Sequence, residues 1–308
     1  MTTLDLNGLA RRVAEELAQA DQRPYSRDSG TEQSGVSPAR RNALMPVPAG
    51  VTYVRDQARI ADFIDHTLLK AEATRREVEK LCSEAREQRF AAVCVNPVWV
   101  TLCRDQLAGS HVKVATVIGF PLGANSTEIK AAEAALAVRQ GADEVDMVAA
   151  IGHIKSGDWS HVATDIAEVV KSAAGRVVKV IIESAALSPV EIIKASALAR
   201  EAGAQYVKTS TGFHTAGGAS AEAVALMRLA VGDALGVKAS GGVRDCDTAL
   251  KMLASGATRI GTSSGVAMAQ CLGRGPLPLS ELLSGPDRHA IQCATGACTP
   301  AEEPAQSY

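Results

Sequence analysis

Apolar residues along this chain gather in short extended runs that alternate with longer segments of helical periodicity. The extended runs cover residues 59–69, 90–97, 112–120, 143–150, 177–184, 205–210, 236–240 and 258–263. Between them, segments such as residues 126–140 and 188–202 repeat apolar positions at helical spacing. Near-continuous apolar strands that alternate with helices predict a parallel sheet covered on both faces.

A helix end, a Gly-Ala step and an apolar run recur three times, with Gly141, Gly203 and Gly256 at the step. Glycine most easily takes the left-handed conformation that ends a helix. One strand and its helix then occupy about 25 to 30 residues, which is the size of a βα unit. Eight such units close a TIM barrel, so we predict an α/β fold with a single (β/α)8 barrel. An open Rossmann-like sheet is the alternative, although the first βα turn lacks a G-x-G-x-x-G pattern.

The barrel is predicted over residues 51–276, between two tails. Residues 1–50 combine a candidate amphipathic helix at residues 6–20 with a polar stretch rich in Ser, Gly and Pro, which predicts a flexible extension. Residues 277–308 predict a flexible C-terminal tail that ends at Tyr308. A phenol on such a tail is a candidate to fold over the barrel mouth and assist proton transfer.

Composition and charge narrow the class of partner. The 308 residues are 46% hydrophobic and carry a formal net charge of -2, without a basic stripe, which argues against nucleic acid. No apolar run approaches the roughly 18 residues of a membrane span. The N-terminus carries Asp5, Glu15 and Glu16, where a targeting peptide would be apolar or poor in acids. We therefore expect a cytoplasmic protein that acts on a small molecule and binds no membrane.

Cysteine and histidine give no sign of a metal site. Most of the seven cysteines lie in apolar segments, where a reduced thiol packs as a small hydrophobe, and no disulfide is expected. The close pair Cys293 and Cys298 has no second pair to complete a zinc site. The six histidines are scattered without ligand spacing. We predict no metal and no cofactor.

Three charged residues stand inside predicted strands. Side chains alternate along a barrel strand, and catalytic groups lie at the carboxyl ends of the strands. Alternation turns Asp146, Lys208 and Lys238 into the barrel interior, because their strand neighbours suit the helix-facing side. The alternative is a buried ion pair that only holds the barrel together. Because buried charges cost several kcal/mol and apolar replacements are often at least as stable, three together favour a function.

Two lysines beside a carboxylate point to amine chemistry. A free lysine has a pKa near 10.4, so very little of it is the neutral amine that attacks a carbonyl. Burial and a second ammonium both favour the neutral form. The pattern predicts a Schiff-base enzyme in which the carboxylate moves the protons of C–C cleavage and imine hydrolysis. It leaves open which lysine is the nucleophile.

Eight strings along the predicted barrel are unusual enough to compare with known families. They are DHTLLKAEAT (65–74), VCVNP (93–97), TVIGFPLGANST (116–127), GADEVDMVAAIG (141–152), VKVIIES (178–184), YVKTSTGFHTAGGAS (206–220), VKASGGVRD (237–245) and IGTSSG (260–265). In this order they resemble the deoxyribose-phosphate aldolase family, over about residues 60–270. The resemblance implies a cofactor-free class I aldolase, a lyase that reversibly cleaves 2-deoxy-D-ribose 5-phosphate to acetaldehyde and D-glyceraldehyde 3-phosphate.

The resemblance also implies roles for the residues of the interior. Lys208 corresponds to the Schiff-base lysine, Lys238 to the second lysine that lowers its pKa and relays protons, and Asp146 to the proton donor and acceptor. Substrate contacts are expected from Asp65, Thr67, Cys94 and Thr211. Apart from the resemblance, Asp65 reads equally well as a helix-capping or loop residue, and Cys94 as an inert buried thiol. Cys94 is also a candidate to add to α,β-unsaturated aldehydes.

The phosphate is expected at the loops after the last two strands, the usual place in this fold. Glycines there let backbone N–H groups approach an anion, and serine hydroxyls add donors. The candidates are Gly212, Gly241, Gly242, Arg244, Ser263 and Ser264. Where short bacterial relatives often carry a lysine after STG, this chain has Phe213, so a cationic phosphate contact is missing.

Two other functions compete with this interpretation. One is a different Schiff-base enzyme, either another sugar-phosphate aldolase or a transaldolase. The other is a non-catalytic barrel that binds phosphosugars, against which the joint presence of Lys208, Lys238 and Asp146 argues. The resemblance further implies a homo-oligomer, a dimer or larger.

Overall fold

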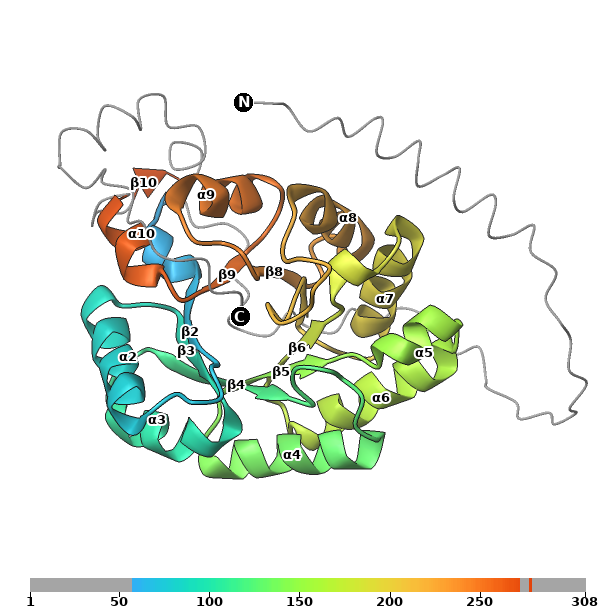
Figure 1. The fold of residues 1–308 in the computed structure, drawn as a ribbon, viewed down its shortest axis with the longest axis horizontal. Coiled ribbons are helices and arrows are strands. Elements are labelled where there is room, and N and C mark those ends of the chain that lie inside the picture. The colour runs from blue at the N-terminus through green and yellow to red at the C-terminus, as the bar shows by residue number, and fades with distance from the viewer. Residues whose placement is uncertain (1–56, 272–276, 279–308) are drawn as a thin grey trace, which may run out of the picture.

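A closed barrel of eight parallel strands forms the body of the structure (Figure 1). The computed structural model describes residues 57–271 and 277–278. The strands around the barrel are β2 (Ile64–Leu68), β3 (Ala92–Val95), β4 (Lys113–Ile118), β5 (Glu144–Val148), β6 (Val177–Ile181), β7 (Tyr206–Lys208), β8 (Gly236–Ser240) and β9 (Arg259–Thr262). Each lies within one of the predicted runs. The TIM barrel is confirmed, and an open sheet is excluded because β9 pairs with β2.

Helices return the chain from one strand to the next and surround the barrel (Figure 1). The α-helices are α2 (Arg75–Gln88), α3 (Val100–Gln106), α4 (Thr127–Gln140), α5 (Ile151–Ser156), α6 (Trp159–Ser172), α7 (Pro189–Glu201), α8 (Ala221–Val231), α9 (Cys246–Ala254) and α10 (Gly265–Cys271). Short 3-10 turns are η1 (Ile60–Phe63), η2 (Pro97–Trp99) and η3 (Ser184–Ala186). Consecutive strands are therefore parallel neighbours, with a helical crossover between them.

Local sequence sets the ends of these helices. Thr74 and Ser188 begin α2 and α7 with capping boxes, in which each hydroxyl accepts a hydrogen bond from the N–H of the glutamate three residues on. Gly141 ends α4 with φ at 111°, and Gly203 and Gly256 have φ of 87° and 108° just after α7 and α9. The three predicted glycine steps therefore do end helices.

Strand residues alternate between two buried environments. The outward residues, such as Val145, Met147 and Val207, join the large apolar core between strands and helices. The inward residues form two groups of opposite character. One is a small apolar cluster of Leu69, Ala92, Cys94, Ala115 and Val117, contributed mostly by β3 and β4. The other is charged and forms the candidate site.

Two short strands lie outside the barrel. β1 (Gln57–Ala58) and β10 (Leu277–Pro278) pair in antiparallel fashion, so the first two residues of the predicted C-terminal tail are in a strand. The candidate helix at residues 6–20, the rest of both predicted tails and Tyr308 lie outside the described residues. No helix in the described part of the chain has the length and apolar character needed to cross a membrane.

Cys246 and Cys271 correct the expectation that the chain has no disulfide. Their sulfur atoms are joined in a disulfide that links α9 to α10, with the Cα atoms 6.7 Å apart. The cysteines are 25 residues apart, and only the packing of two helices brings them together. Cys82, Cys94 and Cys103 are buried free thiols, as expected.

Candidate active site

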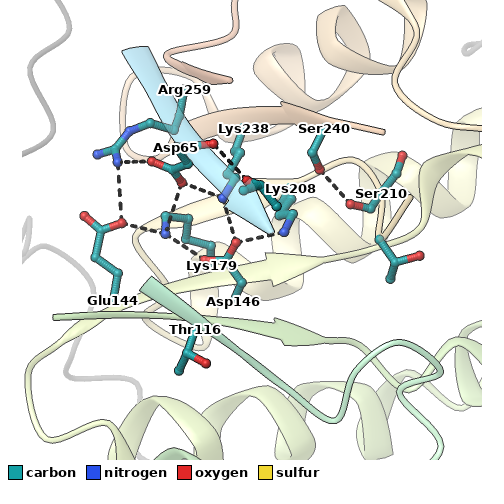
Figure 2. A network of polar contacts seen from close by, with 12 residues as sticks. Asp65, Thr116, Glu144, Asp146, Lys179, Lys208, Ser210, Lys238, Ser240 and Arg259 are labelled. Carbon is teal, nitrogen blue, oxygen red and sulfur yellow. Dashed lines mark hydrogen bonds and ion pairs between the residues drawn. The ribbon is translucent and has the colours of Figure 1, made fainter. Parts of the chain in front are cut away.

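Seven charged side chains from six strands meet inside the barrel (Figure 2). They are Asp65, Glu144, Asp146, Lys179, Lys208, Lys238 and Arg259. All seven are buried, and the three lysines and two aspartates are at most 2% exposed. Strand alternation produces this arrangement, because the residues between them point outward into the apolar core. Asp146, Lys208 and Lys238, which alternation turned inward, therefore meet in the barrel interior.

Asp146 is the centre of this network. Its Oδ2 accepts hydrogen bonds from Lys208 Nζ and Lys238 Nζ, both at 2.8 Å, and its Oδ1 accepts one from Lys179 Nζ at 2.7 Å. Burial, the largest single effect, would raise the pKa of Asp146, but the three ammonium groups together hold it well below its usual range. Asp146 is thus a carboxylate shared by three lysines.

Lys208 differs from its neighbours in how easily it loses a proton. Burial is the largest effect on its pKa and lowers it, Asp146 raises it, and the positive charge of Lys238 lowers it again. The net direction is down, toward a neutral amine. The positive charge of Lys238 is thus one of the causes of the lowered pKa of Lys208.

Lys238 and Lys179 show the opposite behaviour. Burial lowers the pKa of each, but Asp146 and a second carboxylate overcompensate, so the pKa of Lys238 is raised and that of Lys179 is raised well above its usual value. The second carboxylate is Asp65 for Lys238 and Glu144 for Lys179. Of the three lysines, only Lys208 is shifted toward the nucleophilic form.

For Asp65 the structure excludes the alternative of a helix-capping or loop residue. It is the second residue of β2 and fully buried, so it is neither a loop residue nor a helix cap. Its carboxylate accepts from Lys238 Nζ at 2.5 Å and from Arg259 at 2.6 Å. Burial acts to raise its pKa, but the charges of Arg259, Lys238 and Lys179 lower it. Thr67 donates its hydroxyl to the Asp65 carbonyl at 2.8 Å.

Sequence reasoning missed Lys179, Glu144 and Arg259, although the signal was present. Val178 and Val180 flank Lys179 and both join the outer core, so the same alternation rule turns Lys179 inward. Lys179 Nζ lies 2.6 Å from Glu144, and Arg259 bridges Glu144 and Asp65. Lys179 and Arg259 supply counter-charges that favour the ionised forms of Asp146 and Asp65, and Glu144 is a further anionic partner of these two cations.

Cys94 belongs to the apolar side of the interior. It is fully buried in the small cluster, and burial is the main cause of the raised pKa of its thiol. Phe120 and Phe213 pack against this cluster, with their rings edge to face and centroids 5.2 Å apart. Phe213 thus extends an apolar wall.

The hydroxyl of Thr211 connects the loop after β7 to Glu183, which follows β6. The hydroxyl donates to Glu183 Oε2 at 2.5 Å and accepts from the N–H of Phe213 at 3.1 Å, while the Thr211 N–H also donates to the Glu183 carboxylate. The loop after β7 is therefore fixed from the preceding strand. Sequence reasoning did not single out Glu183.

The glycines predicted to hold phosphate come together from two loops. Gly212, after β7, and Gly241 and Gly242, after β8, have φ of 86°, 82° and 78°, a conformation that side chains rarely adopt. A Cβ on Gly241 would lie 3.4 Å from the Cα of Gly212, so the two loops touch. Arg244 and Ser263 are exposed and Ser264 is partly exposed at the starts of the next two helices.

Two of the histidines are not scattered. The rings of His153 and His161 stack with centroids 3.6 Å apart, and Asp158 lies beside them. These three residues are the candidate metal ligands found among the described residues. Asp158 is already engaged, because it accepts from the His161 N–H at the start of α6 and contacts His153 Nδ1 at 3.0 Å. Asp158 thus acts as the helix cap of α6 and as a hydrogen-bond partner of His153.

Comparisons with known proteins agree with this geometry. Residues 59–271 match the family described as DeoC/LacD family aldolase. A protein named deoxyribose-phosphate aldolase from Thermotoga maritima is 56% identical over 220 residues, which are 70% of this chain and 88% of that protein.

Solved structures extend the likeness to the fold. A putative deoxyribose-phosphate aldolase from Coccidioides immitis is 36% identical with a TM-score of 0.68, covering 88% of this chain and 98% of that one. A deoxyribose phosphate aldolase from Aeropyrum pernix, described as having a unique tetrameric structure, is 36% identical with a TM-score of 0.64 and covers 68% of this chain and 89% of that one.

Proposed function

Because the chain belongs to the DeoC/LacD family of aldolases, we propose that it acts as a deoxyribose-phosphate aldolase, the activity named for its relatives. The reaction is the reversible cleavage of 2-deoxy-D-ribose 5-phosphate to acetaldehyde and D-glyceraldehyde 3-phosphate. The protein is then a lyase whose ligands are a small phosphorylated sugar and two aldehydes.

The observation that carries this proposal is a pair of unlike lysines on one carboxylate. Lys208 and Lys238 both contact Oδ2 of Asp146 at 2.8 Å, yet the pKa of Lys208 is lowered and that of Lys238 is raised. One amine is therefore prepared to lose its proton while its neighbour keeps one. A barrel that only bound phosphosugars would have no use for this difference.

Lys208 is assigned as the nucleophile. Its neutral amine attacks C1 of the open-chain sugar, and loss of water from the resulting carbinolamine leaves an iminium. The C2–C3 bond then breaks, its electron pair forms the enamine, and the C3 hydroxyl gives up its proton as D-glyceraldehyde 3-phosphate departs. Protonation of C2 and hydrolysis of the imine release acetaldehyde and restore Lys208.

Asp146 and Lys238 are assigned to proton transfer. Asp146 is held as a carboxylate, which suits it to accept a proton, directly or through water. Lys238 is held as an ammonium, so it can donate one, and its charge disfavours a second ammonium at Lys208. Asp65 is assigned an indirect role, because its carboxylate forms an ion pair with Lys238. Thr67 and Cys94 are candidates to contact the sugar.

The phosphate is assigned to the pocket between the loops after β7, β8 and β9. Three glycines with positive φ let backbone N–H groups approach an anion there. Arg244 follows Gly242 by two residues, and Ser263 and Ser264 follow β9, so their side chains are assigned as further donors. Phe213 supplies no charge, so phosphate affinity rests on these groups.

Assembly and location are part of the same proposal. The Aeropyrum pernix relative is described as a tetramer, which supports a homo-oligomer here. We expect a dimer or larger in the cytoplasm, and a molar mass from light scattering above that of one 32.0 kDa chain. A monomer at working concentration would remove the assembly part alone.

Borohydride trapping tests the mechanism directly. The protein is incubated with 2-deoxyribose 5-phosphate, reduced with borohydride and mapped by peptide mass. We expect a reduced adduct on Lys208, with acetaldehyde released in the unreduced reaction. An adduct on Lys238 would reverse the two lysines, and folded protein without any adduct would contradict Schiff-base catalysis. A panel of donor carbonyls separates other aldolases and transaldolases, because the two-carbon donor acetaldehyde is specific to the proposed reaction.

A further inference from the structure

Glu183 is a buried carboxylate that the proposed chemistry does not use. It follows β6, is 1% exposed, and has φ of 56° and ψ of 58°, the left-handed region. A residue with a side chain rarely takes this conformation without cost, and such residues gather where function fixes the backbone. Ser184 N–H donates to the Thr209 carbonyl at 2.8 Å and Ile182 N–H to the Lys208 carbonyl at 3.0 Å, so the bend is tied to β7 on both sides.

The carboxylate of Glu183 is directed at a single residue of the next loop. Thr211 donates its N–H to both carboxylate oxygens, at 3.2 and 3.3 Å, and its hydroxyl to Oε2 at 2.5 Å. The same hydroxyl accepts from the Phe213 N–H. Glu183 therefore fixes the backbone on both sides of Gly212.

The fixed loop is continuous with the glycine pocket. Ser240 Oγ donates to the Ser210 carbonyl at 2.6 Å (Figure 2), and Thr209 Oγ1 exchanges hydrogen bonds with the Ser240 backbone. A Cβ on Gly212 would lie 3.7 Å from the Cα of Gly241. The loop begins immediately after Lys208, so one short segment joins the amine to the glycines. Glu183 anchors that segment at its far end.

We propose that Glu183 is a positioning residue that sets the Thr211 to Phe213 loop for the phosphorylated end of the sugar, without taking part in imine chemistry. The inference rests on the proposed function, since it assumes that the glycine pocket holds phosphate. The oxygens of Glu183 are buried and accept hydrogen bonds from Thr211, so the side chain acts through that residue and makes no contact with the sugar itself.

The variant Glu183→Gln tests the role, with Glu133→Gln as its matched control. Glutamine keeps the size of the side chain, but its single oxygen cannot accept as the carboxylate does, and its NH2 group faces donors. Glu133 likewise accepts a loop N–H, from Gly119 at 2.7 Å, but on the loop between β4 and α4. Both variants are compared on 2-deoxyribose 5-phosphate and on unphosphorylated 2-deoxyribose.

We expect Glu183→Gln to raise KM for the phosphorylated sugar about tenfold with kcat within about threefold, and to leave kcat/KM for the unphosphorylated sugar within about twofold. Glu133→Gln is expected to change neither. Equal losses on both sugars would show a general structural role and overturn the proposal, as would no loss on either. Wild-type protein that fails to cleave 2-deoxyribose 5-phosphate would overturn the proposed function instead.

A second pair of variants reaches the same contact from the other side, should Glu183→Gln fail to fold. Thr211→Val loses the hydroxyl and should show the same selective rise in KM for the phosphorylated sugar, whereas Thr211→Ser, which keeps the hydroxyl, should show a smaller rise. Where Glu183→Gln does fold, adding Thr211→Val to it should change KM little further, because both changes remove the same interaction. Thr211→Val with an unchanged KM for the phosphorylated sugar, or additive losses in the double variant, would contradict the proposal.

Discussion

The two halves of the barrel interior are equally buried and opposite in chemistry. In the apolar half, Ala92 and Ala115 are fully buried in the cluster that β3 and β4 supply. In the charged half, Asp146, Lys179 and Lys238 are fully buried as well, on β5, β6 and β8. Apolar burial stabilises a fold, whereas buried charges cost free energy that only close pairing offsets. The charged half is thus the part of the interior that stability alone does not explain.

Lys208 lies where the two halves meet. It donates to Asp146 on the charged side, and Cys94 of the apolar side is near enough to influence its pKa. Burial is the largest effect that lowers the pKa of Lys208. Exclusion of water from the amine therefore outweighs its ion pair with Asp146 in setting the direction of the shift.

The largest expected effect comes from removing the amine at this boundary. Lys208→Met keeps a long apolar side chain but cannot form an imine, so we expect kcat for 2-deoxyribose 5-phosphate to fall by more than about 10⁴-fold. Acetaldehyde release measures the loss, and Lys251→Met, at an exposed position on α9, is the control. Residual activity within tenfold of wild type would rule out Lys208 as the nucleophile.

A smaller effect, on stability, separates the halves directly. Lys179→Met leaves Glu144 and one oxygen of Asp146 without their nearest cation, and breaking a buried pair costs about 3 to 5 kcal/mol. Val117→Ala in the apolar half removes two methyl groups and should cost about 2 kcal/mol. Urea unfolding of both variants gives the comparison. If Lys179→Met lost no more than Val117→Ala, the charged half would not depend on its ion pairs.

The pH dependence of catalysis tests how the lysines divide their roles. Lys208 must be neutral to react, so kcat/KM should rise with pH and level off at an apparent pKa below the usual 10.5 of a lysine. Lys238→Met removes a charge that lowers the pKa of Lys208, so the rising limb should move to higher pH. Lys238→Arg keeps the charge and should leave the limb near its wild-type position. A limb that moved to lower pH in Lys238→Met would contradict the assignment.

Sequence alone predicted the barrel because its signals are local. Alternation of strands and helices and the glycines that end helices need no knowledge of distant contacts, and alternation alone turns Asp146, Lys208 and Lys238 inward. The same rule would have found Lys179. Which lysine is the nucleophile could not follow from spacing, since it depends on the unequal sharing of Asp146 and Asp65 between them.

Other features depend on contacts between distant segments. Asp65 and Arg259 are 194 residues apart and meet only because the barrel closes. The contact of Glu183 with Thr211 and the disulfide of Cys246 with Cys271 likewise require neighbouring units to pack. A single sequence contains no local pattern for such pairs, so the ion-pair partners of Asp65 were not predicted and the cysteines were expected to remain reduced.

The smallest expected effect on turnover comes from a substitution in the apolar half, at Cys94. Cys94 is buried beside Lys208 and Lys238, and burial raises the pKa of its thiol, so it should react slowly and take no part in cleavage. Its sulfur can still add to the β-carbon of crotonaldehyde, with the thiol proton passing to the α-carbon. We expect Cys94→Ala to keep kcat within about threefold and to escape the slow inactivation that crotonaldehyde causes in wild type.

The control is Cys103→Ala, at a buried thiol on α3, which should be inactivated like wild type. Equal inactivation of all three proteins would place the sensitive group elsewhere, whereas selective protection would show that the apolar wall opens onto the space where the aldehyde reacts.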